Sequence, residues 1–320
     1  MSLHLENLDL YLSSGKLPIQ VLDKISFSLE DGQTLGIVGE SGCGKSMTAL
    51  AIMQLITSPP LLKMEGKVLW NNVNLLDLTK REMRKIRSKE IAMIFQEPMT
   101  ALNPVMRVGD QIREVLREHN PGNRKSENKK IIDLLDKVGI PSPEQRAQNY
   151  PHQLSGGMRQ RIMIAMALAC GPRLLIADEP STALDVTIQA QILEQLRELC
   201  REFKMGLLFI SHDLDVVGYL ADRILVMYAG EIVEWASTKE LFASPAHPYT
   251  RALQRSRPKK NQKNKLTPIA GNVPPLDQLP QGCRFYDRCE LREDQCAMQR
   301  PPVFKINEHH QVRCFLFAET

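Results

Sequence analysis

The stretch that decides the fold is Gly39-Glu-Ser-Gly-Cys-Gly-Lys45-Ser46, which fits the pattern G-x-x-x-x-G-K-[ST]. A short apolar run, Leu35–Val38, precedes it and reads as a buried strand, and a helical pattern, Ser46–Ile56, follows it. A glycine-rich turn between a strand and a helix aims backbone N–H groups and the positive end of a helix dipole at a polyanion. We therefore expect an α/β core in which this stretch, the P-loop, binds the phosphates of a nucleoside triphosphate.

The P-loop residues have distinct expected roles. The glycines allow the backbone to approach the phosphates, Lys45 reaches the β- and γ-phosphates, and the Ser46 hydroxyl binds Mg²⁺. Cys43 is expected to act through its backbone rather than as a nucleophile. The residues predicted to bind ATP and Mg²⁺ here are Gly39, Ser41, Gly42, Cys43, Gly44, Lys45 and Ser46.

A second chemical element lies far downstream, where Asp178 and Glu179 follow the apolar run Leu174–Ala177. Ligands of an open α/β sheet bind at the carboxyl ends of its strands. Asp178 is therefore expected to hold Mg²⁺ through water, and Glu179 to act on the attacking water, either as its general base or as the group that orients it. Leu207–Ile210 reads as a further parallel strand, and the helical face between the two strands places Cys200 in the core.

Bulk composition limits the alternatives. The chain has 320 residues, 43% of them hydrophobic, and a net charge of +4, which gives no reason to expect nucleic acid as a partner. No run approaches the roughly 18–20 apolar residues of a membrane span. The N-terminus lacks the basic and apolar regions of a secretory signal, so we expect a cytoplasmic protein that contacts membranes through other proteins.

The rest of the chain divides into recognisable segments. Strands Leu3–Leu12 and Val21–Leu29 predict an N-terminal antiparallel sheet, and Ile91–Phe95 a further strand. Helical patterns cover Val108–Val138, broken at Asn120–Asn123, and Ser155–Cys170. A hairpin is expected from Ile224–Tyr228 and Glu231–Trp235. The polar, basic run Ser256–Lys265 reads as an exposed linker.

A third motif, Leu154-Ser-Gly-Gly-Met158, lies between the other two, and the three in this order resemble the ATP-binding subunits of ABC transporters. The resemblance implies a P-loop NTPase core with an antiparallel β subdomain and a helical subdomain at about 98–170, within a nucleotide-binding domain at 1–256, followed by a small Cys-rich C-terminal extension at 257–320. It implies an ATPase that works as a dimer closing around ATP.

The resemblance also assigns roles residue by residue. Gln96 matches the glutamine that contacts Mg²⁺ and the attacking water, His212 the switch histidine near the γ-phosphate, and Tyr11 the aromatic that stacks on adenine. Ser155, Gly156 and Gly157 match the signature that binds the partner subunit's nucleotide, although Met158 stands where Gln is usual. Asp185, at the end of Ser181-Thr-Ala-Leu-Asp185, matches the dimer-contact aspartate.

Four stretches resemble the dipeptide, oligopeptide and nickel importers more narrowly, and are most similar to the D-type dipeptide ATPase: Phe95–Pro104, Tyr150–Leu154, Ala183–Ala190 and His247–Thr250. This implies an F-type ATPase as heterodimer partner, two permeases and an extracytoplasmic binding protein, at the cytoplasmic side of the membrane. The helical stretch from about Pro98 to Gln153 would receive a permease coupling helix. A nickel or metal-chelate cargo, or a soluble ABC ATPase of DNA repair or translation, are the alternatives.

Four cysteines gather near the C-terminus with the spacing Cys283-x5-Cys289-x6-Cys296-x17-Cys314. Four thiolates suit either Zn²⁺ or a [4Fe–4S] cluster, and the residues alone leave both open, with free thiols as a third alternative. The resemblance to dipeptide ATPases favours [4Fe–4S]. A metal would also organise a tail with little apolar periodicity. His309 and His310 are expected to be surface residues rather than ligands.

Overall fold

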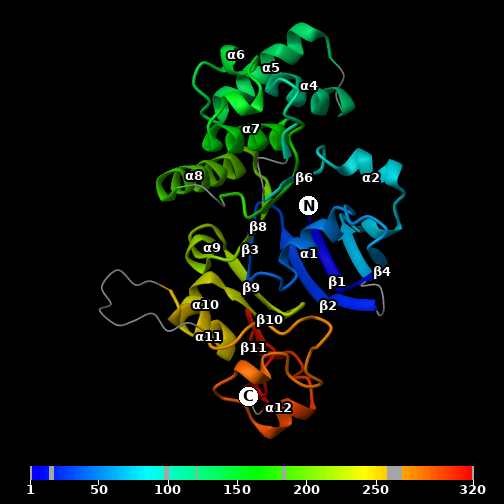
Figure 1. Ribbon diagram of the computed structural model, residues 1–320, viewed down its shortest axis with the longest axis vertical. Helices are drawn as coiled ribbons and strands as arrows, with labels where there is room; N and C mark the ends of the chain where they lie inside the picture. Colours follow the sequence, from blue (N-terminus) through cyan, green and yellow to red (C-terminus); the bar gives the residue numbers. More distant parts are fainter. Residues whose placement is uncertain are drawn as a thin grey trace. The chain divides into compact units, whose positions relative to one another are not determined.

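The computed structural model describes residues 2–13, 18–96, 101–119, 122–181, 185–257 and 269–318. The chain forms two compact units (Figure 1). The first comprises Glu30–Gln33 and Asp77–Phe209, and the second Ser2–Leu29, Thr34–Leu76 and Ile210–Thr320. Parts of four predicted segments lie outside the described residues: 98–100 of the helical subdomain, 120–121 of the break in the helical pattern, 182–184 before Asp185, and 258–265 of the linker.

The first unit is built on three strands, β6 (Ile91–Ile94), β7 (Leu174–Asp178) and most of β8 (Gly206–Ser211), in the order β6-β7-β8. β6 and β7 pair in parallel, with Ile91 opposite Leu174 and Ile94 opposite Ala177. All five residues of β7 are buried, as expected of a strand covered on both faces. The carboxyl ends of β6 and β7 therefore lie at one edge of the sheet.

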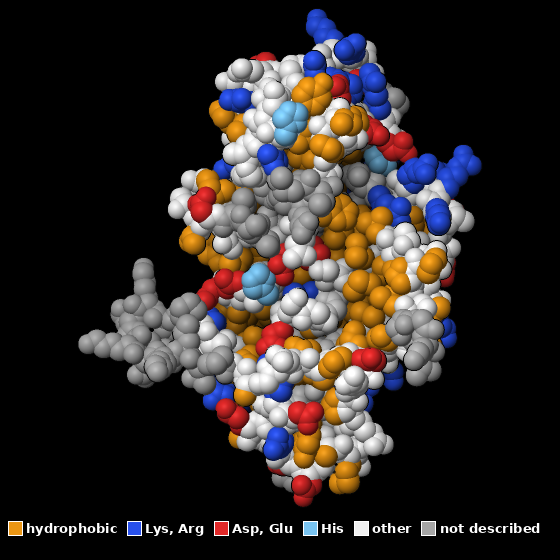
Figure 2. All heavy atoms as spheres, in the orientation of Figure 1, with side chains coloured by type: hydrophobic (Ala, Val, Ile, Leu, Met, Phe, Trp, Pro, Cys, Tyr) orange, Lys and Arg blue, Asp and Glu red, His pale blue; other side chains and the backbone are white. Residues whose placement is uncertain are grey.

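Helices make up most of the remainder of this unit: α2 (Lys80–Ile86), α4 (Val108–His119), α5 (Arg124–Lys137), α6 (Pro143–Arg146), α7 (Gly156–Leu168) and α8 (Val186–Phe203), with a 3₁₀ turn at Pro151–Gln153. Another 3₁₀ turn, Leu75–Asp77, lies where the chain passes from the second unit to the first. The break predicted near Asn120 separates α4 from α5, and the Asn123 side chain caps α5. α5 buries Ile131, Leu134 and Leu135. Lys and Arg side chains gather over the α4–α5 end of the face in Figure 2, the solvent side of amphipathic helices.

The second unit begins with an antiparallel sheet in the order β2-β1-β4-β5. It contains β1 (Ser2–Ser13), β2 (Pro18–Glu30), β4 (Leu61–Trp70) and β5 (Val73–Asn74). The sequence predicted only the first two strands. β4 was missed because its first seven residues are not buried, so Leu61–Lys67 shows no apolar alternation, and pairing with β1 selects its conformation.

The other sheet of this unit runs β11-β12-β10-β9-β3. β3 (Thr34–Val38) and β9 (Arg223–Tyr228) pair in parallel, and β9 turns back into β10 (Glu231–Ser237), the predicted hairpin. β12 (His310–Val312) pairs with β10, and β11 (Phe304–Asn307) pairs with β12. The helices are α1 (Lys45–Ile52), α9 (Leu214–Leu220), α10 (Thr238–Ala243), α11 (Pro248–Arg255) and α12 (Asp294–Met298), with 3₁₀ turns at Tyr286–Arg288 and Phe315–Phe317.

The α/β fold with an antiparallel sheet and a helical part is confirmed, but two expectations are corrected. The helix predicted to reach Ile56 ends at Ile52, because Gln54 takes a positive φ of 47° that a helix does not accommodate. His310, predicted at the surface, is 3% exposed. β12 pairs with β10, which brings the His310 ring to the carboxylate of Glu234 with Nε2 2.8 Å from Oε1.

The described part of the Cys-rich tail packs within the second unit. Its strands extend the sheet beside β10, as Figure 1 shows near β11. Val312 and Cys314 pack with Ala246 in a small apolar cluster that Phe304 and Phe317 cover. Strand pairing and apolar contacts therefore contribute to the order of this segment. The boundary proposed at residue 257 stays a prediction.

Candidate functional site

The P-loop of the second unit connects β3 to α1, and its glycines meet distinct backbone requirements. Gly42 and Gly44 have φ values of 79° and 103°, which residues with a Cβ rarely adopt. At Gly39 the requirement is space, because a Cβ there would lie 2.2 Å from the carbonyl oxygen of Met227 on β9. The neighbouring parallel strand therefore presses against the loop where it leaves β3.

Lys45 begins α1 and is 5% exposed. Its ammonium Nζ donates to the carbonyl oxygens of Gly39, at 2.8 Å, and Glu40, at 2.9 Å. The Cys43 sulfur lies 3.9 Å from the same nitrogen, so the cation is held inside the curve of the loop by neutral groups of the loop itself. Backbone N–H groups, a helix N-terminus and this ammonium together form a site for a multiply charged anion.

Cys43 is fully buried within the same loop. Burial raises the pKa of its thiol, and the nearby Lys45 opposes this rise without reversing it. Its carbonyl oxygen accepts the N–H of Gly230, 3.0 Å away, in the turn between β9 and β10. A buried, protonated thiol is not a nucleophile, as expected, and the residue acts through its backbone.

The first unit brings two of the predicted catalytic residues together. Gln96 lies just beyond β6, and Asp178 and Glu179 lie at and just beyond the end of β7. The Gln96 side-chain amide donates to the Glu179 carboxylate, with Nε2 3.3 Å from Oε2. Asp178 is 4% exposed, whereas Glu179 is part-exposed and takes a positive φ of 46°. The backbone of Glu179 is therefore strained, and its carboxylate pairs with the Gln96 amide. This carboxylate–amide pair can orient a water.

The signature residues form the first turn of α7. Ser155 is the N-cap, and its hydroxyl accepts the N–H of Met158 at 3.3 Å. Asp185 caps α8 in the same way, accepting the N–H of Ile188 at 3.0 Å. A Cβ on Gly157 would meet the Ile188 side chain at 3.0 Å, so the starts of α7 and α8 pack closely here. Ser155, Gly156 and Asp185 are solvent-exposed.

The two remaining predicted residues belong to the second unit. His212 follows β8 and is exposed. Tyr11 lies in β1 opposite Lys63 on β4 and is part-buried rather than in the core. Desolvation, and then the carboxylate of Asp9, raise the pKa of its phenol, so the ring stays neutral.

The four tail cysteines line one small cavity together with His247 and Phe285. The Cys283 N–H donates to the carbonyl oxygen of Cys296 at 2.7 Å. Burial raises the thiol pKa of Cys283 to about 12 and that of Cys314 to about 11. Even so, no group of three or more His, Cys, Asp or Glu side chains within the described ranges is placed to hold a metal ion. As they lie among the described residues, these side chains are therefore not arranged as the iron–sulfur or zinc ligand set that the spacing predicted.

One functional contact was missed by reasoning from the sequence. The Tyr249 hydroxyl accepts the backbone N–H of Glu40, the second residue of the P-loop, at 2.9 Å. Tyr249 lies in the stretch His247-Pro-Tyr-Thr250, whose resemblance to importer ATPases was the available signal.

No described helix combines the length and the apolar composition that crossing a bilayer requires.

Comparison with known proteins adds two family matches. The family described as ABC transporter matches residues 22–182, and the one described as Oligopeptide/dipeptide transporter, C-terminal region, matches residues 233–296. The oligopeptide transport ATP-binding protein AppD of Bacillus subtilis is 47% identical over 318 residues, 99% of this chain and 97% of that protein. The dipeptide transport ATP-binding protein DppD of Escherichia coli is 46% identical over 313 residues, 98% and 95% of the two chains.

A solved structure shares the fold. The ATP-binding cassette MJ0796, described as dimeric in a post-hydrolysis state with ADP and Pi, superposes with a TM-score of 0.66 at 27% identity. The match covers 74% of this chain and 98% of that one.

Proposed function

The chain belongs to the ATP-binding subunits of ABC transporters, and from this premise we propose that it hydrolyses ATP to drive the import of di- or oligopeptides. The ATPase core is common to the whole family and does not indicate a cargo. The observation that carries the proposal is the match of residues 233–296 to the C-terminal region of oligopeptide and dipeptide transporters. The names of the relatives AppD and DppD support the same cargo class.

In this proposal the P-loop binds the nucleotide, and the Gln96–Glu179 pair acts on the attacking water. The P-loop amides and Lys45 bind the β- and γ-phosphates, which requires Lys45 to exchange its two carbonyl partners for phosphate oxygens. Ser46 and Asp178 are the residues that would bind Mg²⁺, which would neutralise developing charge on the phosphates. Glu179 accepts the proton of the attacking water, and Gln96 orients that water from the other side. His212 contacts the γ-phosphate, and Tyr11 stacks on the adenine.

We propose further that the molecule works as a dimer. The exposed N-terminal turn of α7, with Ser155, Gly156 and Gly157, binds the γ-phosphate held by the partner subunit, and Asp185 contacts the partner. Support comes from the exposure of this helix start and from the dimeric form reported for MJ0796. We expect the partner to be an F-type ATPase.

The assembly would also contain two permeases on the cytoplasmic face of the membrane, served by an extracytoplasmic binding protein. The helical stretch at about 98–153 would receive a permease coupling helix. Nickel or a metal chelate remains the alternative cargo, since the ATPase does not contact cargo. Titrating peptides and Ni²⁺ against the cognate binding protein decides between them.

The tail cysteines carry a separate proposal, a [4Fe–4S] cluster held by Cys283, Cys289, Cys296 and Cys314, with Zn²⁺ as the alternative. It is supported by their convergence on one cavity. Four thiolates fit the donor preference of either centre. Iron, sulfide and zinc analysis of protein purified without oxygen tests it. Cys200→Ser, which removes a thiol buried in α8, is the matched control for Cys289→Ser.

The Glu179→Gln variant tests the proposed reaction. It keeps the shape and the hydrogen bond to Gln96 but removes the base, so hydrolysis should fall by at least about 100-fold while ATP binding persists and the closed dimer accumulates. Glu198→Gln, on the exposed side of α8, is the matched control and should hydrolyse ATP normally. Normal turnover by Glu179→Gln would rule out the assigned base.

A further inference from the structure

The C-terminal tail contacts the P-loop directly, through a residue between its cysteines. Arg288 meets Glu40, the second residue of the loop, with Nη1 2.7 Å from Oε2 and Nη2 3.0 Å from Oε1. The side chains of Arg288 and Glu40 are 6% and 26% exposed. This is a two-bonded, largely desolvated pair, the geometry in which an arginine–carboxylate contact is strong and specific.

Arg288 is itself held in place by other groups. Its Nε donates to the carbonyl oxygen of Ala270 at 2.8 Å, and Nη1 also reaches the hydroxyl of Tyr228 at 3.3 Å. The guanidinium lies 5.7 Å from the ring centroid of Tyr228 and 5.9 Å from that of Phe285. Because the guanidinium cannot shift without losing these contacts, it fixes the position of the Glu40 carboxylate.

Glu40 links the Arg288 contact to Lys45. Its carbonyl oxygen is one of the two acceptors of the Lys45 ammonium, and its N–H bonds to Tyr249. The Tyr249 ring packs against Phe285, with centroids 5.4 Å apart. The side chain, the N–H and the carbonyl oxygen of Glu40 therefore all have hydrogen-bond partners. The tail segment Cys283–Cys289 supplies the partner of the side chain, Arg288, and packs against the partner of the N–H, Tyr249.

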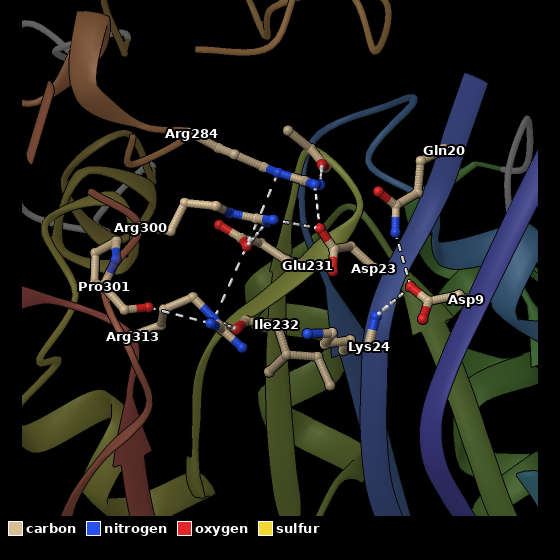
Figure 3. A network of polar contacts seen from close by, with 11 residues as sticks. Asp9, Gln20, Asp23, Lys24, Glu231, Ile232, Arg284, Arg300, Pro301 and Arg313 are labelled. Carbon is tan, nitrogen blue, oxygen red and sulfur yellow. Dashed lines mark hydrogen bonds and ion pairs between the residues drawn. The ribbon is translucent and has the colours of Figure 1, made fainter. Parts of the chain in front are cut away.

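The same segment also contacts the β9–β10 turn, which in turn contacts the P-loop. Arg284, 5% exposed, donates to the carbonyl oxygen of Ala229 and to Asp23, within the network of Figure 3. The next residue after Ala229, Gly230, donates to the carbonyl oxygen of Cys43. One short segment of the tail thus supports the P-loop directly at Glu40 and indirectly at Cys43.

Charge explains why the contact matters for function. Glu40 carries a carboxylate in a loop that must accept a triphosphate, and a free carboxylate beside a polyanion opposes binding. Arg288 neutralises that carboxylate and fixes its position. We propose that Arg288 is a positioning residue of the P-loop, which pairs with Glu40 so that the loop is shaped and neutralised for the triphosphate. This rests on the proposed ATPase function.

The test measures the Kd of the full-length chain for MgATP by titration calorimetry. Arg288→Gln should raise the Kd at least about tenfold, the effect of losing one charge-assisted contact. Adding Glu40→Gln removes the exposed carboxylate, so the double variant should return to within about threefold of wild type. Arg255→Gln breaks a tail ion pair with Glu290, both partners exposed, and is the matched control without effect.

Steady-state kinetics in the assembled transporter supply a readout that a general loss of structure would not give. The KM for ATP should rise with the Kd while kcat at saturating ATP changes by less than about twofold. If Arg288→Gln does not fold, Arg288→Lys replaces it in the test. Lysine keeps the positive charge but cannot make the two parallel hydrogen bonds of the guanidinium, so the Kd for MgATP should rise about threefold.

Two results would overturn the proposal: an unchanged Kd in the Arg288 variant that folds, or a double variant as weak as Arg288→Gln. A fall in kcat at constant KM would also contradict it. Failure of the wild-type chain to bind MgATP at all would instead refute the proposed function, so the two ideas fail separately.

Discussion

Acid should destabilise the second unit through His247, the N-cap of α11. This ring is 2% exposed, and its Nδ1 accepts the N–H of Tyr249 at 3.0 Å, which requires an unprotonated nitrogen. Burial lowers the pKa of His247 to about 4. Glu234 on β10 opposes this fall, and Arg251 on the same helix adds to it.

The sign and size follow from the two pKa values. An unfolded histidine titrates near 6.5, so between pH 6.5 and 4 the unfolded chain binds a proton that the folded chain excludes. Stability is therefore complete above about pH 6.5 and is lost as the pH falls. At pH 5 the unfolded pKa is about 1.5 units above the pH and the folded site is still neutral, which costs about 2 kcal/mol.

The assay is urea unfolding at pH 7.5 and 5.0, followed by tryptophan fluorescence. The chain has two tryptophans, and both Trp70 and Trp235 lie in the second unit, so the signal reports on that unit. His247→Asn keeps a side-chain acceptor for the N-cap but does not titrate. Wild type should lose about 2 kcal/mol more than this variant between the two pH values. Equal losses in the two proteins would refute the reasoning.

Three further outcomes test other parts of the structure. Glu231→Gln should destabilise the chain by about 3 kcal/mol in urea unfolding, because its buried carboxylate faces Arg284, Arg300 and Arg313 (Figure 3), and a cost below about 1 kcal/mol would contradict a desolvated network. Gly39→Ala should abolish MgATP binding in calorimetry, since its Cβ has no room beside Met227, and retained affinity would contradict that contact. The Cys200 thiol, whose pKa burial raises to about 12, should resist iodoacetamide at pH 7.5 until urea unfolds the chain, as mass spectrometry of the peptide would show.

Local motifs were predictable because each is a short run of consecutive residues with one backbone role. The P-loop needs glycines at fixed offsets between a strand and a helix, and the structure places positive φ values at Gly42 and Gly44 accordingly. The meeting of Gln96 with Glu179 was also within reach, since two parallel neighbouring strands bring their carboxyl ends to one edge.

Elements without a local signature were not predictable. β4 has no buried residue in its first half and becomes a strand by pairing with β1. His310 reads as a surface residue beside His309, yet strand pairing buries it against Glu234. In both cases the deciding partner is more than 45 residues away in the chain.

Read alone, the sequence determined that this chain has a phosphate-binding loop, a carboxylate pair after a buried strand and an ABC signature, because these depend on residue type at close spacing. Only the tertiary structure decided that the cysteine-bearing tail pairs with β10 and that its Arg288 forms an ion pair with Glu40, 248 positions away. The physical reason is that a guanidinium selects its carboxylate by desolvation and two-point geometry, and both exist only after the chain has packed.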